Sequence, residues 1–255
     1  MPDVFNQILV QAETGEAPSM KELIRRSIES LENPQLVVTE EQLDKLVRFA
    51  QNLAEHGVER GLTALSQPED IVRELIVDSL GAMPFISAGQ RVADLGSGAG
   101  VPGIPLAIVR PDSFFIMVES QTRKANWIEE QILELGLQSL AHALPMRIED
   151  VAHSDNWRGK LDLVVAKALS SLPSLVELSL PLLKVNGALL AYKGIKVQEE
   201  IEQAANALDK LHGKVEEGFT YALDGRQRAI CVVRKLRATP KTYPRRTGLP
   251  QHNPL

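Results

Sequence analysis

The sequence predicts an α/β fold in which a mostly parallel sheet follows a helical N-terminal region. From Gln90 onward, short apolar runs alternate with stretches of helical periodicity, and this alternation is typical of parallel strands joined by crossover helices. In the first third of the chain, apolar residues recur at helical spacing. With 255 residues, the chain is long enough for one large domain with a helical attachment.

The N-terminal region is expected to form three helices. The first is indicated by the apolar residues Leu23, Ile24, Ile28 and Leu31. Asn33-Pro34 ends this pattern, because proline cannot continue a helix. Thr39 and the polar residues after it have the pattern of a capping box, which predicts a second helix ending near Gly57. Pro68 predicts the start of a third helix that runs through Leu80.

The sheet is expected to contain seven strands. Four parallel strands are predicted at the apolar runs Arg91–Leu95, Phe114–Val118, Leu161–Ala166 and Ala188–Tyr192, with another before Arg147. The intervening helices are predicted at Pro105–Val109, Thr122–Leu135, Leu172–Leu183 and Val197–Leu211. Lys214–Tyr221 and Arg228–Lys235 have only a turn between them, so they should form a terminal antiparallel hairpin. This layout is typical of class I S-adenosylmethionine-dependent methyltransferases, whose fold is Rossmann-like.

We expect four parts along the chain. These are a helical extension at residues 1–38, a helical region packed on the core at 39–88, a methyltransferase domain at 89–236 and a basic tail at 237–255. From Arg234 to Leu255 there are six bases and no acids, although the whole chain has a net charge of −5. Such a segment favours contact with a polyanion, because Lys and Arg displace counterions from phosphates. A solvated terminus is the alternative interpretation.

Composition excludes several classes of protein. A single cysteine, Cys231, excludes an internal disulfide framework and a cysteine-based zinc site. The five histidines never fall at metal-ligand spacing, so no metal is expected. No apolar run approaches the roughly 20 residues that span a bilayer, and the N-terminus lacks a secretory signal. We therefore expect a cytoplasmic protein that does not contact membranes.

The glycine-rich segment from Asp94 to Gly103 is the most informative part of the sequence. It follows a strand and enters a helix, where glycines allow a ligand to approach the backbone. The spacing G-x-G-x-x-G of dinucleotide sites is present by count but begins too late after the strand. An acid before the glycines suits a sulfonium and an ammonium group, whereas a pyrophosphate would be repelled. The loop therefore favours S-adenosylmethionine, with contacts expected from Asp94, Gly96, Ser97, Gly98, Gly100 and Val101.

Two later positions are expected to complete a nucleoside site. Glu119, followed by Ser120, ends the second strand, where an acid can bind both ribose hydroxyls. This feature does not discriminate between the two cofactors, because NAD enzymes place an acid similarly. Ile148 and Glu149 follow the third strand, where methyltransferases usually hold the adenine. No P-loop lysine follows the glycines, which argues against an NTPase.

The segment from Asp94 to Pro111 closely resembles the cofactor loop of the ribosomal RNA small subunit methyltransferase G family, also called glucose-inhibited division protein B. The extension Pro102-Gly-Ile-Pro105 is more specific than the glycines. Similar motifs occur at Gly61-Leu62-Thr63, Asp78-Ser79, Lys167–Leu172, Tyr192-Lys193-Gly194 and Thr239–Gly248. The resemblance runs from about Thr39 to the C-terminus.

The resemblance implies methyl transfer from S-adenosylmethionine to N7 of one guanosine in small-subunit (16S) ribosomal RNA. N7 carries a lone pair and no proton, so the reaction needs alignment and no catalytic base. Lys167 would face the target base at the end of the fourth strand. Four further bases would position phosphates: Lys193, Lys241, Arg245 and Arg246. The expected partner is the RNA or the assembled small subunit, and the expected state is a monomer.

The sequence departs from the family pattern at four positions. The family usually has Asn in place of Gly61, often His in place of Glu74, and often Arg in place of Ser66 and Lys167. Lysine keeps the charge of arginine but loses its planar fork. Two alternatives therefore stay open: a methyltransferase that acts on another RNA, a protein or a small molecule, and a relative that binds RNA without turnover.

Overall fold

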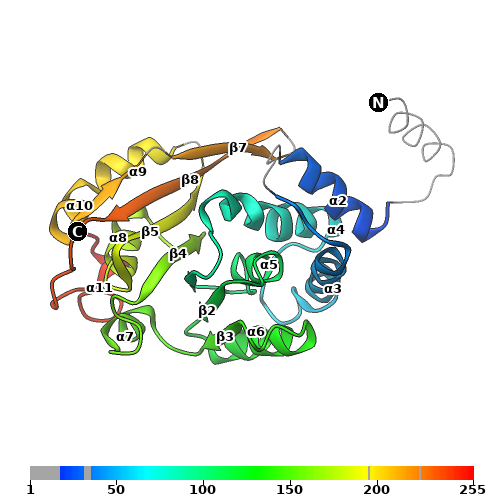
Figure 1. Cartoon of the computed structure of the whole chain (residues 1–255), viewed down its shortest axis with the longest axis horizontal. Helices are drawn as coiled ribbons and strands as arrows, with labels where there is room; N and C mark the ends of the chain where they lie inside the picture. The colour runs from blue at the N-terminus through cyan, green and yellow to red at the C-terminus, as the bar shows by residue number, and fades with distance from the viewer. Residues whose placement is uncertain (1–17, 32–35, 195, 217, 224) are drawn as a thin grey trace.

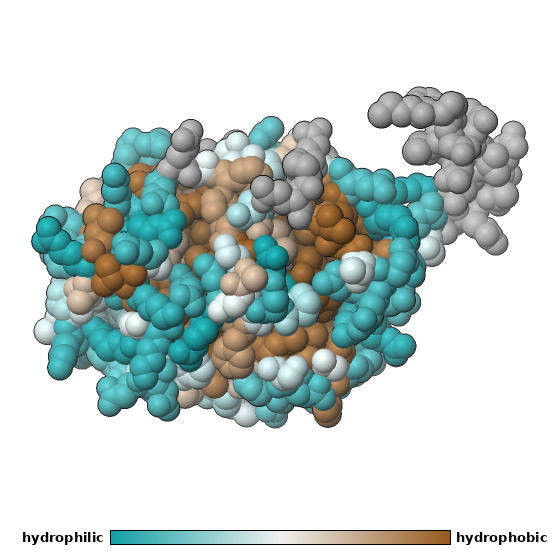
Figure 2. Space-filling model, in the orientation of Figure 1, coloured by the Kyte–Doolittle hydropathy of each residue, from teal (hydrophilic) through white to brown (hydrophobic). Residues whose placement is uncertain are grey.

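The computed structural model in Figure 1 describes residues 18–31, 36–194, 196–216, 218–223 and 225–255. A sheet occupies the centre and helices cover both of its faces (Figure 1). Hydrophobic residues gather mostly in the middle of the face seen in Figure 2, whereas hydrophilic residues dominate its lower margin. The expected chain break at Asn33-Pro34 lies outside the described residues.

Five parallel strands and three antiparallel segments form the sheet. The parallel strands are β1 (Arg91–Leu95), β2 (Phe114–Val118), β3 (Ala141–Leu144), β4 (Leu161–Lys167) and β5 (Leu183–Lys193). The remaining segments are β6 (Gly213–Val215), β7 (Phe219–Leu223) and β8 (Arg226–Lys235). The strand order is β3-β2-β1-β4-β5-β8-β6, with β7 also paired to β8. The predicted fold class, a mostly parallel sheet that ends in antiparallel strands, is confirmed.

One predicted strand differs in detail from the structure. The segment Lys214–Tyr221 was expected to be continuous, but it divides into β6 and β7, which pair with different parts of β8. The interruption lies beside Gly218, and glycine inside a strand weakens pairing because it has no side chain to pack. The sheet therefore contains eight segments instead of the seven strands expected, because β6 and β7 together correspond to one predicted strand.

Helices connect the strands. They are α5 (Gly103–Val109), α6 (Thr122–Glu134), α7 (Ile148–His153), α8 (Leu172–Ser179), α9 (Val197–Gln203) and α10 (Ala205–Leu211), whereas α11 (Leu249–His252) follows the last strand, β8. The helix expected at Leu172–Leu183 is shorter than predicted, because Pro181 cannot continue it and Leu183 begins β5. The helix expected at Val197–Leu211 divides into α9 and α10 at Ala204.

Side chains that alternate along the central strands form two cores. On β4, Leu163 and Val165 belong to one core, whereas Val164 and Ala166 belong to the other. Both faces of the strand are therefore buried, as expected for a parallel sheet between helical layers.

The N-terminal helices share the first of these cores. They are α2 (Met20–Ser30), α3 (Glu40–His56), the π-helical segment η1 (Ile71–Val77) and the 3₁₀ segment η2 (Asp78–Phe85), whereas the short helix α4 (Pro68–Asp70) contributes no buried residue. The predicted capping box is confirmed: the Gln42 backbone N–H donates to Thr39 Oγ1 at 3.3 Å, and the Thr39 N–H donates to Gln42 Oε1 at 2.9 Å. Phe49 of α3 is fully buried in the core that β4 contributes to. The helical region and the sheet therefore share one buried core.

Candidate functional site

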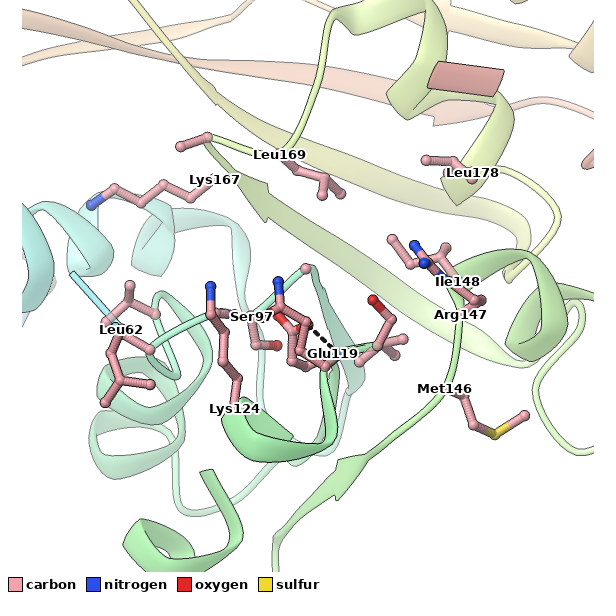
Figure 3. Close-up of a pocket in the computed structure, with 18 of the residues that line it drawn as sticks. Leu62, Ser97, Glu119, Lys124, Met146, Arg147, Ile148, Lys167, Leu169 and Leu178 are labelled. Carbon is pink, nitrogen blue, oxygen red and sulfur yellow. Dashed lines mark hydrogen bonds between the residues drawn. The ribbon is translucent and has the colours of Figure 1, made fainter. Parts of the chain in front are cut away.

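A cavity of about 390 Å³ lies at the carboxyl ends of β1, β2 and β4 (Figure 3). The chain runs from β1 to β2 and β3 on one side, and then returns to place β4 on the other side of β1. Ligands of open α/β sheets bind at the crevice that such a reversal creates. The cavity therefore lies where the fold favours a ligand site.

The loop between β1 and α5 forms the floor of this cavity. Gly96 and Gly98 have φ angles of 69° and 54°, which favour glycine. A Cβ on Gly96 would lie 2.5 Å from Leu169 Cδ1, so a side chain there would collide with the neighbouring loop. A Cβ on Gly98 would meet no atom closer than 3.8 Å and would instead enter open space. Gly98 thus keeps its backbone accessible to a ligand.

Asp94 lies beneath this loop and does not line the cavity. Its Oδ2 accepts a hydrogen bond of 3.0 Å from the Gly103 N–H at the start of α5. Its Oδ1 is buried and has no hydrogen-bond partner among the described residues. Burial raises the pKa of the Asp94 carboxyl to about 7. The structure therefore gives Asp94 a loop-positioning contact, while its predicted contact with a cofactor stays a prediction.

Glu119 joins the end of β2 to the glycine loop. Its Oε2 accepts from the Gly98 N–H at 3.0 Å, and its Oε1 accepts from the Gln121 N–H at 2.8 Å (Figure 3). The residue is only 7% exposed and lines the cavity. Each carboxylate oxygen has two lone pairs, so both can accept one further hydrogen bond from a ligand.

The structure brings most of the predicted cofactor residues together. Besides Glu119, the cavity is lined by Gly96, Ser97, Gly98, Val101, Ser120, Ile148 and Glu149. Gly100 does not line it and packs against Ile104. Several lining residues were not predicted as cofactor contacts: Leu62, Thr63, Lys124, Met146, Leu169 and Gln251. Leu62 and Thr63 lie in a motif noted only for its family resemblance, whereas nothing in the local sequence indicates Gln251.

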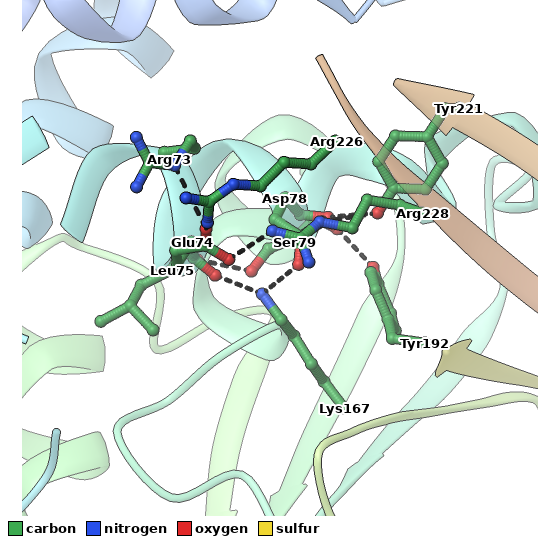
Figure 4. A network of polar contacts seen from close by, with 10 residues as sticks. All are labelled: Arg73, Glu74, Leu75, Asp78, Ser79, Lys167, Tyr192, Tyr221, Arg226 and Arg228. Carbon is green, nitrogen blue, oxygen red and sulfur yellow. Dashed lines mark hydrogen bonds and ion pairs between the residues drawn. The ribbon is translucent and has the colours of Figure 1, made fainter. Parts of the chain in front are cut away.

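Lys167 lies at the junction of this cavity with a second one of about 310 Å³. Its Nζ lies 2.6 Å from Asp78 Oδ2 and donates to the carbonyl oxygen of Glu74 (Figure 4). Tyr192, whose ring centroid is 5.8 Å from Nζ, also lines the second cavity. Asp78 therefore fixes the ammonium group between the two cavities.

The charge of Glu74 is balanced by arginines of the β7–β8 hairpin. Glu74 Oε1 lies 3.2 Å from Arg226 Nη1, and Glu74 Oε2 lies 2.6 Å from Arg228 Nη2 (Figure 4). Arg73 adds a contact of 3.1 Å through its Nε. The Glu74 carboxylate is thus neutralised within the fold.

Tyr221 extends the same network into the hairpin. Its hydroxyl donates to Asp78 Oδ1 at 2.7 Å. Burial raises the pKa of Tyr221 well above its ordinary value, and the nearby Asp78 carboxylate acts in the same direction. The phenol therefore stays a hydrogen-bond donor and helps to hold Asp78 against Lys167.

The basic residues predicted to bind RNA have different environments. Lys193 pairs with Glu200 at 2.6 Å beside the second cavity, whereas Lys241 and Arg246 are exposed. Arg245 differs from the expectation: its guanidinium forms a two-point ion pair with Glu177, which is fully buried. A guanidinium held in this way is engaged within the fold, and its predicted contact with phosphate stays a prediction.

Across the part of the chain that the structure describes, no cluster of three or more His, Cys, Asp or Glu residues is arranged to hold a metal ion. Among the same residues, none of the helices is long and apolar enough to cross a membrane.

Some known proteins resemble this chain in sequence, and others resemble it in fold. The family model described as rRNA small subunit methyltransferase G matches residues 42–231. The ribosomal RNA small subunit methyltransferase G of Deinococcus radiodurans is 38% identical over 93% of this chain and 94% of its own length. The namesake from Syntrophomonas wolfei is 41% identical over 81% of this chain and 97% of its own length.

Solved structures at low identity show the fold alone. The B. subtilis tRNA methyltransferase TrmK has a TM-score of 0.52 and 16% identity, covering 67% of this chain and 69% of its own. TYW2 of M. jannaschii, in complex with AdoMet, has a TM-score of 0.51 and 17% identity, covering 63% and 76%. Since the family model spans most of the sheet and the relatives match almost end to end, this chain belongs to the rRNA small subunit methyltransferase G family.

Proposed function

We propose that this chain transfers the methyl group of S-adenosylmethionine to N7 of a guanosine in 16S ribosomal RNA, with Lys167 between cofactor and target base. As a member of its family, the chain is an S-adenosylmethionine-dependent rRNA methyltransferase. The role proposed for Lys167 rests on one observation: this residue lines both cavities and therefore lies in the wall between them.

The residues present fit the cofactor. Gly98 leaves space above its backbone, and Glu119 presents a carboxylate that can accept hydrogen bonds from both ribose hydroxyls. Ile148 and Glu149 line the cavity beyond β3, where the adenine would lie. Asp94 Oδ1, which has no partner among the residues that the structure describes, lies beneath the loop, and the ionised carboxyl favours a cationic group above it. When bound, the cofactor supplies an electrophilic methyl group.

This chain's own residues contribute mainly positioning. The acceptor N7 has no proton to lose, so no general base is required. Lys167, held by Asp78, would orient the base in the second cavity so that N7 faces the first cavity. Glu74 and Asp78 also line the second cavity, but their carboxylates are paired with Arg226, Arg228 and Lys167, so they would serve to position this ammonium group.

We infer that one copy of the chain is sufficient for this reaction, because a single chain supplies the lining of both cavities. The RNA substrate favours a cytoplasmic site of action.

Transfer of labelled methyl groups to small ribosomal subunits tests this proposal. The subunits would come from a strain that lacks this family's activity, and the product would be mapped by strand cleavage specific for N7-methylguanine. We expect label at a single guanine. If cofactor binds but no RNA is labelled, the proposed substrate is wrong, and assays with other RNAs and with small molecules would follow.

A further inference from the structure

The C-terminal segment, residues 239–255, is docked against the body of the protein. Besides the ion pair between Arg245 and Glu177, Arg158 Nη1 donates to the carbonyl oxygen of Tyr243 at 2.8 Å. Ser174 Oγ of α8 donates to the carbonyl oxygen of Pro250 at 2.8 Å. The segment therefore has a defined position along α8, which a freely solvated tail would not have.

This docking carries the segment to the first cavity. The Gly248 N–H donates to Glu149 Oε1 at 2.8 Å, and Glu149 itself lines the cavity. Gln251, on the short helix α11, contributes to the same lining together with Ile148 and Leu178. The end of the cavity beyond β3 is thus built jointly by α7, α8 and the C-terminal segment.

Glu119 determines which part of the cofactor would occupy this end. If its carboxylate holds the ribose at the end of β2, the base lies farther along the sheet toward β3 and α7. Glu149 lines the cavity at that end, and its partner Gly248 is followed three residues later by Gln251, which also lines the cavity. A glutamine amide carries a donor and an acceptor side by side, which matches the N6 amino group and a ring nitrogen of adenine.

We propose that the C-terminal segment forms the adenine end of the cofactor site, with Gln251 binding the edge of the base and Gly248 orienting Glu149. This inference rests on the proposed use of S-adenosylmethionine. It replaces RNA contact by Arg245 with a positioning role, because the Arg245–Glu177 pair holds the segment in place. Exposed Lys241 and Arg246 keep their predicted role toward RNA.

Binding of two nucleosides by calorimetry tests the inference without requiring RNA. The first probe is S-adenosylhomocysteine. The second is S-inosylhomocysteine, in which a carbonyl oxygen replaces the N6 amino group. The full-length protein should bind the adenine compound more tightly. Gln251→Ala should weaken that binding by about tenfold and bring the two affinities close together, because the discriminating amide is gone.

His252→Ala is the matched control, since His252 is the exposed neighbour of Gln251 on α11 and does not line the cavity. Its affinities should equal those of the unaltered chain. Truncation after Thr247 removes both Gly248 and Gln251 but retains Arg245, and it should weaken binding of S-adenosylhomocysteine at least as much as Gln251→Ala.

The outcomes separate the two proposals. If the unaltered chain binds S-adenosylhomocysteine and Gln251→Ala binds both probes with unchanged affinities, the role of the C-terminal segment is wrong while the cofactor assignment holds. If the unaltered chain binds neither probe, the cofactor assignment fails and this inference fails with it.

Discussion

At the scale of single residues, Asp94 combines a motif position with an unusual environment. Its carboxyl group is fully buried, one oxygen positions α5, and the other has no partner among the described residues. The acid-first pattern predicted that this carboxylate contacts the cofactor, and that contact stays a prediction. The pattern could not predict that one oxygen would be used by Gly103, because that contact depends on how the loop closes over the carboxylate.

The stability of the protein should therefore depend on pH through Asp94. Because its pKa is higher in the folded state, about 7, than in the unfolded chain, the folded state binds the proton more strongly between these values. The free energy of unfolding should fall as pH rises from about 4 to about 7, by as much as about 4 kcal/mol from this group. Asp94→Asn should remove that part of the pH dependence, as measured by urea unfolding at pH 5 and pH 8. Equal pH dependence in Asp94→Asn and the unaltered chain would contradict the prediction. Asp155→Asn, at an exposed site, is the control and should keep the pH dependence of the unaltered chain.

Lys167 should influence turnover more than cofactor affinity. Lys167→Met removes the ammonium group between the two cavities and leaves Asp78 without its closest cation. We expect kcat for rRNA methylation to fall about 100-fold, since loss of alignment by a small distance has effects of this size. Lys167→Arg should retain much more activity, because it restores the charge. Unchanged kcat in Lys167→Met, measured by single-turnover assays, would exclude the role assigned to this residue.

At the scale of elements, the sequence predicted features that depend on neighbouring residues, but it did not predict contacts between residues far apart in the chain. The Thr39 capping box and the alternation of strands and helices depend on residues close together in sequence, and both are confirmed. The docking of the basic tail depends on the pair Glu177–Arg245, whose members are 68 positions apart. No periodicity or composition connects them, so the tail could be predicted only as a basic segment.

The exposed bases of this docked segment provide a prediction about RNA affinity. Lys241→Ala combined with Arg246→Ala should lower affinity for small-subunit RNA at low salt. It should also reduce the slope of log affinity against log salt by about 1.4–1.8, if each base neutralises one phosphate. Filter binding between 50 and 250 mM salt measures the slope. Lys210→Ala, at an exposed position on α10, should leave it unchanged; the same slope in the double variant would show that neither base contacts phosphate.

At the scale of the whole molecule, the N-terminal helices and the sheet form one packed unit. Phe49 of α3 and Val165 of β4 belong to the same buried core. The helical region expected to pack on the core thus shares its buried residues with the sheet, while the boundary expected at residues 88 and 89 stays a prediction. Ligand binding at the carboxyl ends of the strands should consequently stabilise the entire unit, and this effect can be measured as one unfolding transition.

We expect S-adenosylhomocysteine at about 100 times its dissociation constant to stabilise the protein by about 2.7 kcal/mol, which corresponds to a rise in Tm of about 5–10 °C. Glu119→Gln should abolish most of this rise at the same ligand concentration. Its amide group would direct N–H donors toward the backbone N–H groups of Gly98 or Gln121. Glu59→Gln, at an exposed site, is the control. A full rise in Tm for Glu119→Gln in differential scanning fluorimetry would remove Glu119 from the ligand site.

The ion pairs that join Glu74 to Arg226 and Arg228 have an evolutionary consequence. These residues lie on separate elements, and each arginine would face less negative charge if residue 74 became neutral or basic. Substitutions at 74 and 228 should therefore be accepted together more often than singly, which makes the two positions a covarying pair. Relatives with histidine at the position of Glu74 should tend to lack the arginine at the position of Arg228, and an alignment of such relatives would test this expectation directly.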